Sequence, residues 1–183
     1  MSNSSSPPPG AALPSITLVL GGARSGKSRH AEGLLAACPG PWLYVATAEI
    51  RDEEMRARVD AHRARRGESW ITREVPLALA DCLAESDRPA LVDCLTLWLT
   101  NLMLAEQDIE AAAGALLAAL DARPAPTVLV ANEVGLGIVP DNALARRFRD
   151  EAGRLNQRLA AAADYVVFLA AGLPLVLKGE GRP

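Results

Sequence analysis

Eight residues near the start of the chain combine glycines, a lysine and a serine in the pattern of a phosphate-binding loop. The run Gly21-Gly22-Ala23-Arg24-Ser25-Gly26-Lys27-Ser28 fits G-x-x-x-x-G-K-[ST]. Glycines allow backbone N–H groups to close around phosphate oxygens, and the N-terminus of a following helix adds the positive end of its dipole. In such a loop Lys27 reaches the β- and γ-phosphates and the Ser28 hydroxyl binds Mg²⁺.

The residues on both sides of this loop support the same interpretation. Residues 16–20 are apolar and rich in β-branched side chains, which predicts a buried strand. Residues 29–37 continue from the Lys-Ser pair as a helix. The alternative is a glycine-rich turn that carries a lysine without function, but strand, loop and helix in this order are the context that a P-loop requires. The sequence therefore predicts a nucleoside triphosphate site.

Two further segments carry acidic residues at the ends of predicted strands. Asp93 ends the apolar run 90–93, so it resembles the Walker B aspartate that holds Mg²⁺, or it is an ordinary helix cap. Residues 132–140 begin with Asn132 and Glu133 and form a glycine-rich loop after another strand. Loops at strand ends often carry function, but spacing alone does not separate a site from a surface loop here.

His62 lies among arginines on a predicted helix over residues 52–66. Arg58 and Arg66 are one turn away, and Arg65 is three residues on. Guanidinium groups disfavour the cationic form of an imidazole and also attract phosphate, which suits a histidine that attacks phosphorus. From the residues alone, a solvated basic helix with an incidental histidine is the simpler interpretation.

Length, charge and cysteine content limit the class of protein. The 183 residues with a formal charge of −3 suit one domain over 15–183 and predict no general attraction to nucleic acid or anionic membranes. Three scattered cysteines suit a reducing cytoplasm. The Ser- and Pro-rich residues 1–14 are expected to be a disordered tail without a signal-peptide core, and no apolar run is long enough to span a membrane.

Apolar segments that alternate with amphipathic ones predict an α/β fold. Strands are expected at 42–48, 70–74, 90–93, 127–131 and 165–170, with a short antiparallel edge at 175–178. Helices are expected at 76–85, 95–104, 108–122 and 141–163. Their alternation indicates a mainly parallel sheet with helices on both faces. The helix at 95–104 is apolar on nearly every side, so it belongs in the core or in a subunit interface.

Several of these motifs, taken together, resemble one enzyme family. The P-loop at 21–28, Tyr44 to Ala48, the run 54–59 with His62-Arg63, Trp70 with Glu74, and the segments 132–140 and 148–157 occur in order over residues 16–178. They resemble the bifunctional adenosylcobinamide kinase / adenosylcobinamide-phosphate guanylyltransferase family of cobalamin (vitamin B12) biosynthesis. Gly67 departs from the proline that relatives usually have after the Arg-Arg pair.

The resemblance implies a RecA-like P-loop NTPase fold, a homotrimer and a two-step activity. The family phosphorylates the aminopropanol hydroxyl of adenosylcobinamide with ATP or GTP. It then transfers GMP from GTP to that phosphate through a GMP-histidine intermediate, which gives adenosylcobinamide-GDP and pyrophosphate. The catalytic residues implied are His62, the nucleophile, and Lys27, with Mg²⁺ on Ser28 and Asp93. The nucleotide contacts implied are Gly21, Gly22, Ala23, Arg24, Ser25, Gly26, Lys27, Ser28, Ala46, Thr47, Ala48, His62, Arg63, Ala64, Arg65, Glu74 and Asp93.

Two other functions remain open on the residues. One is a P-loop small-molecule kinase in which His62 is a bystander, and the other is a regulatory GTP-binding module. The second would usually show a guanine-reading Asn-Lys-x-Asp segment, which this sequence lacks. The general base of the kinase step is not identified, although Glu133 and Asp93 are candidates.

Overall fold

The computed structural model describes residues 13–49, 53 and 67–179. The expected helix over 52–66 lies almost wholly outside these residues, and His62 and Arg63 to Arg65 lie outside them too. The same holds for residues 1–12 of the expected tail. Leu13, the first described residue, packs against buried side chains on one face of the sheet.

The described chain is organised around one twisted sheet of seven strands in the order β3-β2-β4-β5-β1-β6-β7. The strands are β1 (Ile16–Gly21), β2 (Trp42–Ala46), β3 (Trp70–Glu74), β4 (Ala90–Asp93), β5 (Thr127–Asn132), β6 (Tyr165–Ala170) and β7 (Leu173–Lys178). Every neighbouring pair is parallel except β6 and β7, which form an antiparallel hairpin. The expected parallel sheet with a short antiparallel edge is confirmed.

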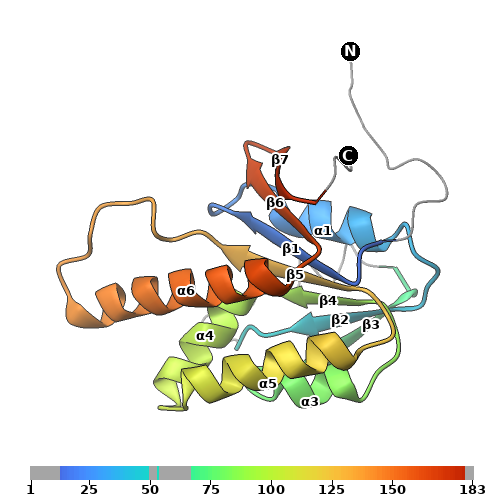
Figure 1. The fold of residues 1–183 in the computed structure, drawn as a ribbon, viewed down its shortest axis with the longest axis horizontal. Coiled ribbons are helices and arrows are strands. Elements are labelled where there is room, and N and C mark those ends of the chain that lie inside the picture. Colours follow the sequence, from blue (N-terminus) through green and yellow to red (C-terminus); the bar gives the residue numbers. More distant parts are fainter. Residues whose placement is uncertain (1–12, 50–52, 54–66, 180–183) are drawn as a thin grey trace.

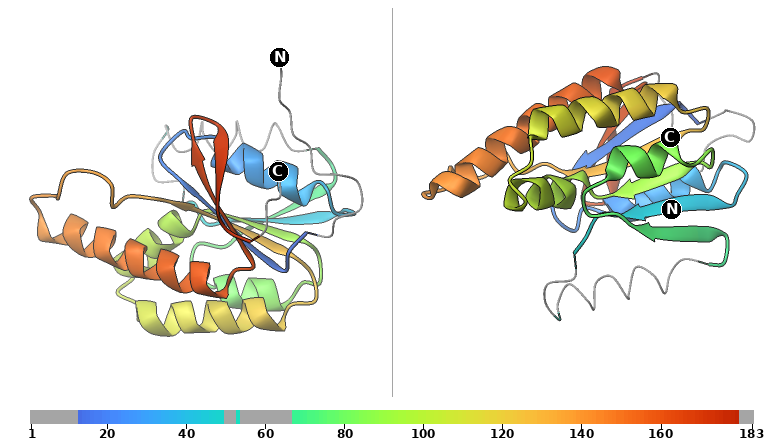
Figure 2. Two further views of the ribbon diagram at one scale, coloured as in Figure 1. Left: turned by 45° about the horizontal axis from the view of Figure 1, so that its top comes forward. Right: turned by 90° about the horizontal axis from the view of Figure 1, so that it is seen from below.

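Helices cover both faces of this sheet. They are α1 (Lys27–Leu35), α3 (Leu79–Ala84), α4 (Leu95–Leu104), α5 (Ile109–Ala122) and α6 (Ala143–Ala162). Among them α1 lies on one face, and α3, α4, α5 and α6 lie on the other (Figures 1 and 2). Because the central strands are buried on both faces, they are continuous apolar runs rather than alternating ones.

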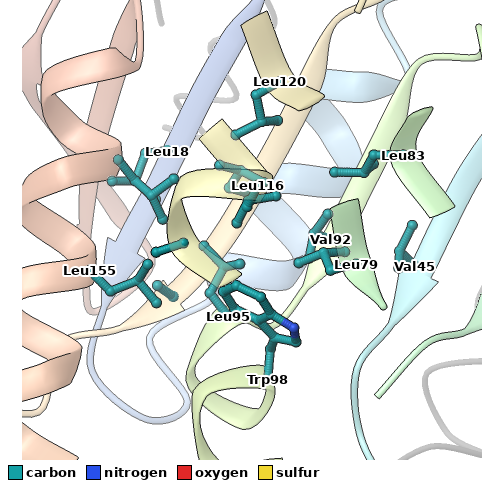
Figure 3. Close-up of a cluster of buried hydrophobic side chains, with 14 of the residues drawn as sticks. Leu18, Val45, Leu79, Leu83, Val92, Leu95, Trp98, Leu116, Leu120 and Leu155 are labelled. Carbon is teal, nitrogen blue, oxygen red and sulfur yellow. The ribbon is translucent and has the colours of Figure 1, made fainter. Parts of the chain in front are cut away.

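Successive residues of the central strands supply the two cores. Leu18, Val45, Val92 and Leu129 pack toward α3–α6, and Figure 3 shows several of them around Leu116 of α5 and Trp98 of α4. Their neighbours Val19, Tyr44, Leu91 and Val130 pack toward α1. Period-two alternation explains why adjacent residues enter different cores.

Helix α4 belongs to the first of these cores. Leu95, Trp98, Leu99 and Leu102 are each no more than 1% exposed within the described chain. The sequence left two placements open for this apolar helix, the core and a subunit interface, and the core is correct. The apolar character of α4 therefore gives no support to a subunit interface.

Several element boundaries differ from expectation by one to three residues. β2 ends at Ala46, so Thr47 and Ala48 leave the sheet, and α3 covers only 79–84 of the expected 76–85. The last long helix begins after Asn142, whose side chain accepts a hydrogen bond from Ala145 N, rather than at Asp141. No described helix is long and apolar enough to cross a membrane.

Candidate functional site

The carboxyl ends of the parallel strands bring most of the predicted site residues to one edge of the sheet. Gly21, at the end of β1, lies opposite Asn132 of β5. Ala46, at the end of β2, lies opposite both Asp93 of β4 and Glu74 of β3. Open α/β sheets bind their ligands at this edge. The sheet thus gathers the glycine loop, Ala46, Glu74 and Asp93, although they are widely separated in the sequence.

The glycine loop adopts a backbone that side chains would obstruct. Gly21 has φ +152° and Gly26 has φ +96°, and a Cβ on Gly21 would lie 2.5 Å from Leu169 O and 2.7 Å from Ser25 Oγ. The Ser25 side chain is buried against Gly21, while Ala23 and Arg24 are exposed. Close approach to β6 and the left-handed backbone therefore both require glycine at position 21.

Lys27 opens α1 and folds back into the loop. Its Nζ donates a hydrogen bond to Gly22 O at 2.7 Å, and the residue is only 7% exposed. Burial lowers the pKa of this ammonium, and the neighbouring Cys94 and Asp93 act in the opposite direction. A polyphosphate would add negative charge here and favour the charged form of Lys27. The geometry suits the role that the motif predicts.

A contact that sequence reasoning missed holds the loop from the side. The turn between β6 and β7 contains Ala171 and Gly172 at positive φ, and Gly172 N donates to Ser25 O at 3.0 Å. A Cβ on Gly26 would lie 3.4 Å from Gly172 Cα. The Gly-x-Pro pattern at 172–174 is typical of a turn, but nothing local indicates that this turn supports the P-loop.

Asp93 is held in place at the end of β4. Its Oδ2 accepts a hydrogen bond from the Tyr44 hydroxyl at 3.0 Å. Burial first, and then the charge of Asp93, raise the pKa of the adjacent Cys94 thiol to about 11, so this thiol stays protonated at neutral pH. Cys38, Cys82 and Cys94 are all free.

The donors at this edge fit a magnesium ion bound together with phosphate. Mg²⁺ in such sites takes one or two protein oxygens and completes its shell with water and substrate phosphate. A hydroxyl and a carboxylate, Ser28 and Asp93, are oxygen donors of this kind. No group of three or more His, Cys, Asp or Glu side chains among the described residues forms an all-protein metal cage.

The other residues predicted to contact the nucleotide lie at the ends of β2 and β3 or directly after β2. Thr47 is fully buried, and its Oγ1 donates to Cys94 O at 2.7 Å and accepts from Cys94 N at 2.9 Å. Ala48 is half-buried, and Glu74 is exposed at the end of the edge strand. The buried amide of Asn101, which sequence reasoning missed, also reaches Thr47.

The loop after β5 begins at this edge and then leaves it. Asn132 N donates to Thr96 Oγ1 at 2.7 Å, and Glu133 N donates to Gly21 O at 3.1 Å. Glu133 Oε1 accepts from Gly135 N at 2.6 Å. Further along, Leu136 and Ile138 are 83% and 98% exposed, where the loop runs outward before α6 (Figure 1). The second half of the segment is therefore a surface loop, whereas the first half lies at the edge of the sheet, where a role in the site stays a prediction.

Of the two histidines in the sequence, only His30 lies among the described residues. His62 lies outside the described residues, so its role stays a prediction. His30 is on α1, half-buried, and its Nε2 has no hydrogen-bond partner within the described structure. Burial lowers the pKa of His30 and favours its neutral form.

A parallel sheet that carries a glycine loop between β1 and α1, with a lysine turned into that loop, defines the class of P-loop nucleotide-binding proteins. The solved flagellar accessory protein FlaH from Methanocaldococcus jannaschii has a similar fold, with a TM-score of 0.55 at 12% identity over 93% of this chain and 81% of that one. This similarity confirms the predicted fold class.

Sequence comparison identifies the family within that class. The family model for cobinamide kinase / cobinamide phosphate guanyltransferase matches residues 17–177. The bifunctional adenosylcobalamin biosynthesis protein CobP of Pseudomonas aeruginosa is 52% identical over 89% of this chain and 97% of its own length. The corresponding protein CobU of Salmonella typhimurium is 46% identical over 89% of this chain and 99% of its own length. The chain therefore belongs to the cobinamide kinase / cobinamide phosphate guanyltransferase family, whose members are transferases.

Proposed function

We propose that this protein phosphorylates adenosylcobinamide and then transfers GMP from GTP to the product, giving adenosylcobinamide-GDP. The observation that carries the proposal is the position of Lys27 and Asp93 at one edge of the sheet, in a chain whose relatives are bifunctional adenosylcobalamin biosynthesis proteins. Lys27 donates to Gly22 O of the glycine loop, and burial lowers its pKa while the neighbouring Cys94 and Asp93 oppose that shift. Loop, lysine and carboxylate are what both triphosphate reactions need.

In the kinase step, the aminopropanol hydroxyl oxygen attacks the γ-phosphorus of ATP or GTP. A P–O bond forms, the bond to the β-phosphate oxygen breaks, and the nucleoside diphosphate leaves. Lys27 and the loop N–H groups would neutralise charge that develops on the phosphate oxygens. Ser28 and Asp93 would hold Mg²⁺, which supplies further positive charge to the phosphates. Glu133 and Asp93 are the candidates to take the hydroxyl proton.

In the transfer step, an imidazole nitrogen of His62 attacks the α-phosphorus of GTP and pyrophosphate leaves. The phosphate of adenosylcobinamide-phosphate then displaces the histidine and takes the GMP group. A neutral imidazole is required, because the protonated ring has no free electron pair. Ala46, Thr47, Ala48, Glu74 and Arg63 to Arg65 would contact the guanine nucleotide. Splitting the transfer into two displacements at phosphorus is the advantage of covalent catalysis.

The experiment that tests the proposal follows the GMP group. The protein is incubated with α-labelled GTP and Mg²⁺, denatured, and assayed for label that survives base but not acid, as a phosphoramidate does. We expect labelling of the wild type and none from γ-labelled GTP, whose label leaves with pyrophosphate. His62→Ala should lose the label and keep at least part of the ATP-dependent phosphorylation of cobinamide.

His30→Gln is the matched control, because it removes the other histidine of the chain. This variant should still be labelled. Label that persists in His62→Ala would show that another residue is the nucleophile. A wild type that phosphorylates cobinamide but never becomes labelled would instead favour a small-molecule kinase without guanylyl transfer.

We also propose that the protein is a homotrimer, as the family resemblance implies. Exposed apolar side chains are available for such contacts on the loop after β5, with Leu136 and Ile138, and on β7, with Leu173, Leu175 and Leu177. Light scattering coupled to gel filtration measures the mass directly. A monomeric mass at micromolar concentration would contradict the trimer without affecting the proposed chemistry.

A further inference from the structure

Asn101 is a buried amide in an otherwise apolar part of α4. The residue is 5% exposed and lies between buried Leu99 and Leu102. Burying an amide without partners is unfavourable, so a buried asparagine is expected to make hydrogen bonds that hold other parts of the chain. The partners of Asn101 therefore indicate what it does.

Both hydrogens of the Asn101 amide go to backbone carbonyls outside the helix. Nδ2 donates to Thr47 O at 2.8 Å and to Pro76 O at 3.1 Å. Thr47 directly follows β2, and Pro76 lies just after β3, its neighbour in the sheet. One side chain thus joins the two segments in which these adjacent strands leave the sheet.

Trp98 of α4 and Cys94, which lies between β4 and α4, hold the same two segments. Trp98 Nε1, one turn before Asn101, donates to Leu77 O at 2.8 Å, so two side chains of α4 hold consecutive carbonyls. Thr47 Oγ1 exchanges two hydrogen bonds with Cys94, the residue before α4 begins. The glycine loop has different supports, since Gly21 packs on Leu169 of β6 and Ser25 O accepts from Gly172 N.

We propose that Asn101 is a positioning residue for the nucleoside end of the nucleotide site. This inference rests on the proposed function, in which Ala46 to Ala48 and Glu74 contact the guanine nucleotide. Asn101 fixes the carbonyls that follow these strand ends and touches no substrate itself. The site then has two halves with different main supports: the glycine loop on β1, α1 and the β6–β7 turn binds the phosphates, and the segments held by the Asn101 and Trp98 side chains of α4 bind the nucleoside.

Asn101→Leu tests this division, because it keeps the size of the side chain and removes both donors. The nucleoside segments should lose their fixed position, while the glycine loop keeps its own supports. We expect the Kd for GTP, measured by calorimetry, to rise about tenfold, with a smaller change in kcat of guanylyl transfer. The inhibition constant of inorganic tripolyphosphate, which probes the phosphate half alone, should stay within about twofold of the wild-type value.

Thr100→Val is the matched control on the same helix. The Thr100 hydroxyl donates only to Thr96 O, within α4, at 3.0 Å. This variant should change neither constant. A variant that is merely less stable would not alter the ratio of the two constants at a temperature where it is folded, so the ratio separates positioning from general stability. Asn101→Ser is made in parallel, because its shorter side chain cannot reach either carbonyl. If Asn101→Leu does not fold, the same changes in the two constants are expected of Asn101→Ser.

An unchanged Kd for GTP in the folded variants would overturn the inference, and so would a parallel weakening of GTP and tripolyphosphate. Either result leaves the proposed function intact if the wild type still forms the acid-labile GMP adduct. A wild type that binds tripolyphosphate but not GTP would overturn the proposed function, and the inference with it. The two failures are therefore distinguishable in one set of measurements.

Discussion

Replacing Arg123 with methionine should destabilise the protein more than the same replacement of an exposed arginine would. Arg123 follows α5 and is only 9% exposed. Its guanidinium donates to the carbonyls of Leu83, Ser86 and Arg88, and its Nε donates to Thr127 Oγ1 at 3.0 Å. These bonds join the start of β5 to the end of α3 and the loop before β4, so one side chain connects three parts of the fold.

The magnitude follows from the number of bonds and the cost of burial. Methionine keeps most of the apolar stem but removes four hydrogen bonds, three to carbonyls and one to a hydroxyl. At about 1 kcal/mol net for each hydrogen bond, the loss is about 4 kcal/mol. Burial lowers the pKa of the guanidinium, which indicates that desolvation offsets part of this gain. We therefore expect a loss of about 3 kcal/mol, or a fall in Tm of roughly 6–12 °C for a chain of this length.

Urea unfolding followed by circular dichroism measures this difference, with Arg154→Met as the control. Arg154 has a 64% exposed side chain that pairs with Glu151 at 2.8 Å, so its loss should cost less than about 1 kcal/mol. The lysine of Arg123→Lys can donate to only some of these acceptors, so its loss of unfolding free energy should lie between those of Arg123→Met and Arg154→Met. If Arg123→Met and Arg154→Met unfold at the same urea concentration, the buried bonds contribute nothing net and the reasoning fails.

Three further predictions concern the site and its helix. Gly21→Ala should abolish GTP binding or folding, because its Cβ would overlap neighbouring atoms and the residue has a positive φ. Gly33→Ala, whose Cβ would meet nothing within 4 Å on α1, should instead stabilise the protein by about 0.5–1 kcal/mol. Calorimetry of GTP binding and thermal melting distinguish the two effects. Tyr44→Phe frees the Asp93 carboxylate from its hydroxyl partner and should raise the Mg²⁺ concentration for half-maximal activity about tenfold, while an unchanged Mg²⁺ requirement would contradict this orienting role. Burial lowers the pKa of His30, so the unfolded chain binds this proton more readily, and wild-type stability should fall as the pH drops below about 6.5. Urea unfolding at several pH values should show a weaker fall in His30→Gln. Equal slopes of unfolding free energy against pH in the two proteins would count against burial of the neutral ring.

The parts of the fold that sequence reasoning predicted are those specified by neighbours in the chain. The strand at 16–20, the loop at 21–28 and the helix after it form one continuous unit, and the motif fixes their order. Apolar runs likewise located β4, β5 and β6 to within a residue. Helix ends were less accurate, because Asn142 and Asp141 are equally good caps by type and only the backbone decides between them.

The parts that could not be predicted depend on residues distant in sequence. Nothing local indicates that β1 lies between β5 and β6, or that Tyr44 reaches Asp93 from 49 residues away. The amide of Asn101 did carry a signal, since an amide inside an apolar helix needs partners, but its partners at Thr47 and Pro76 follow only from the tertiary structure. Sequence specifies such a polar group, and the fold specifies its role.

The strand order also explains why one helix supports half of the site. Because β4 lies directly beside β2, a helix that starts two residues after Asp93 begins next to the end of β2, where Thr47 leaves the sheet. Asn101 is eight residues after Asp93 and within reach of Thr47 O and Pro76 O. The carboxylate proposed to bind Mg²⁺ and the segments proposed to bind the nucleoside therefore share a rigid support. The distance between them is set by β4 and α4, whereas their distance from Lys27 is set by the hydrogen bonds between β4, β5 and β1.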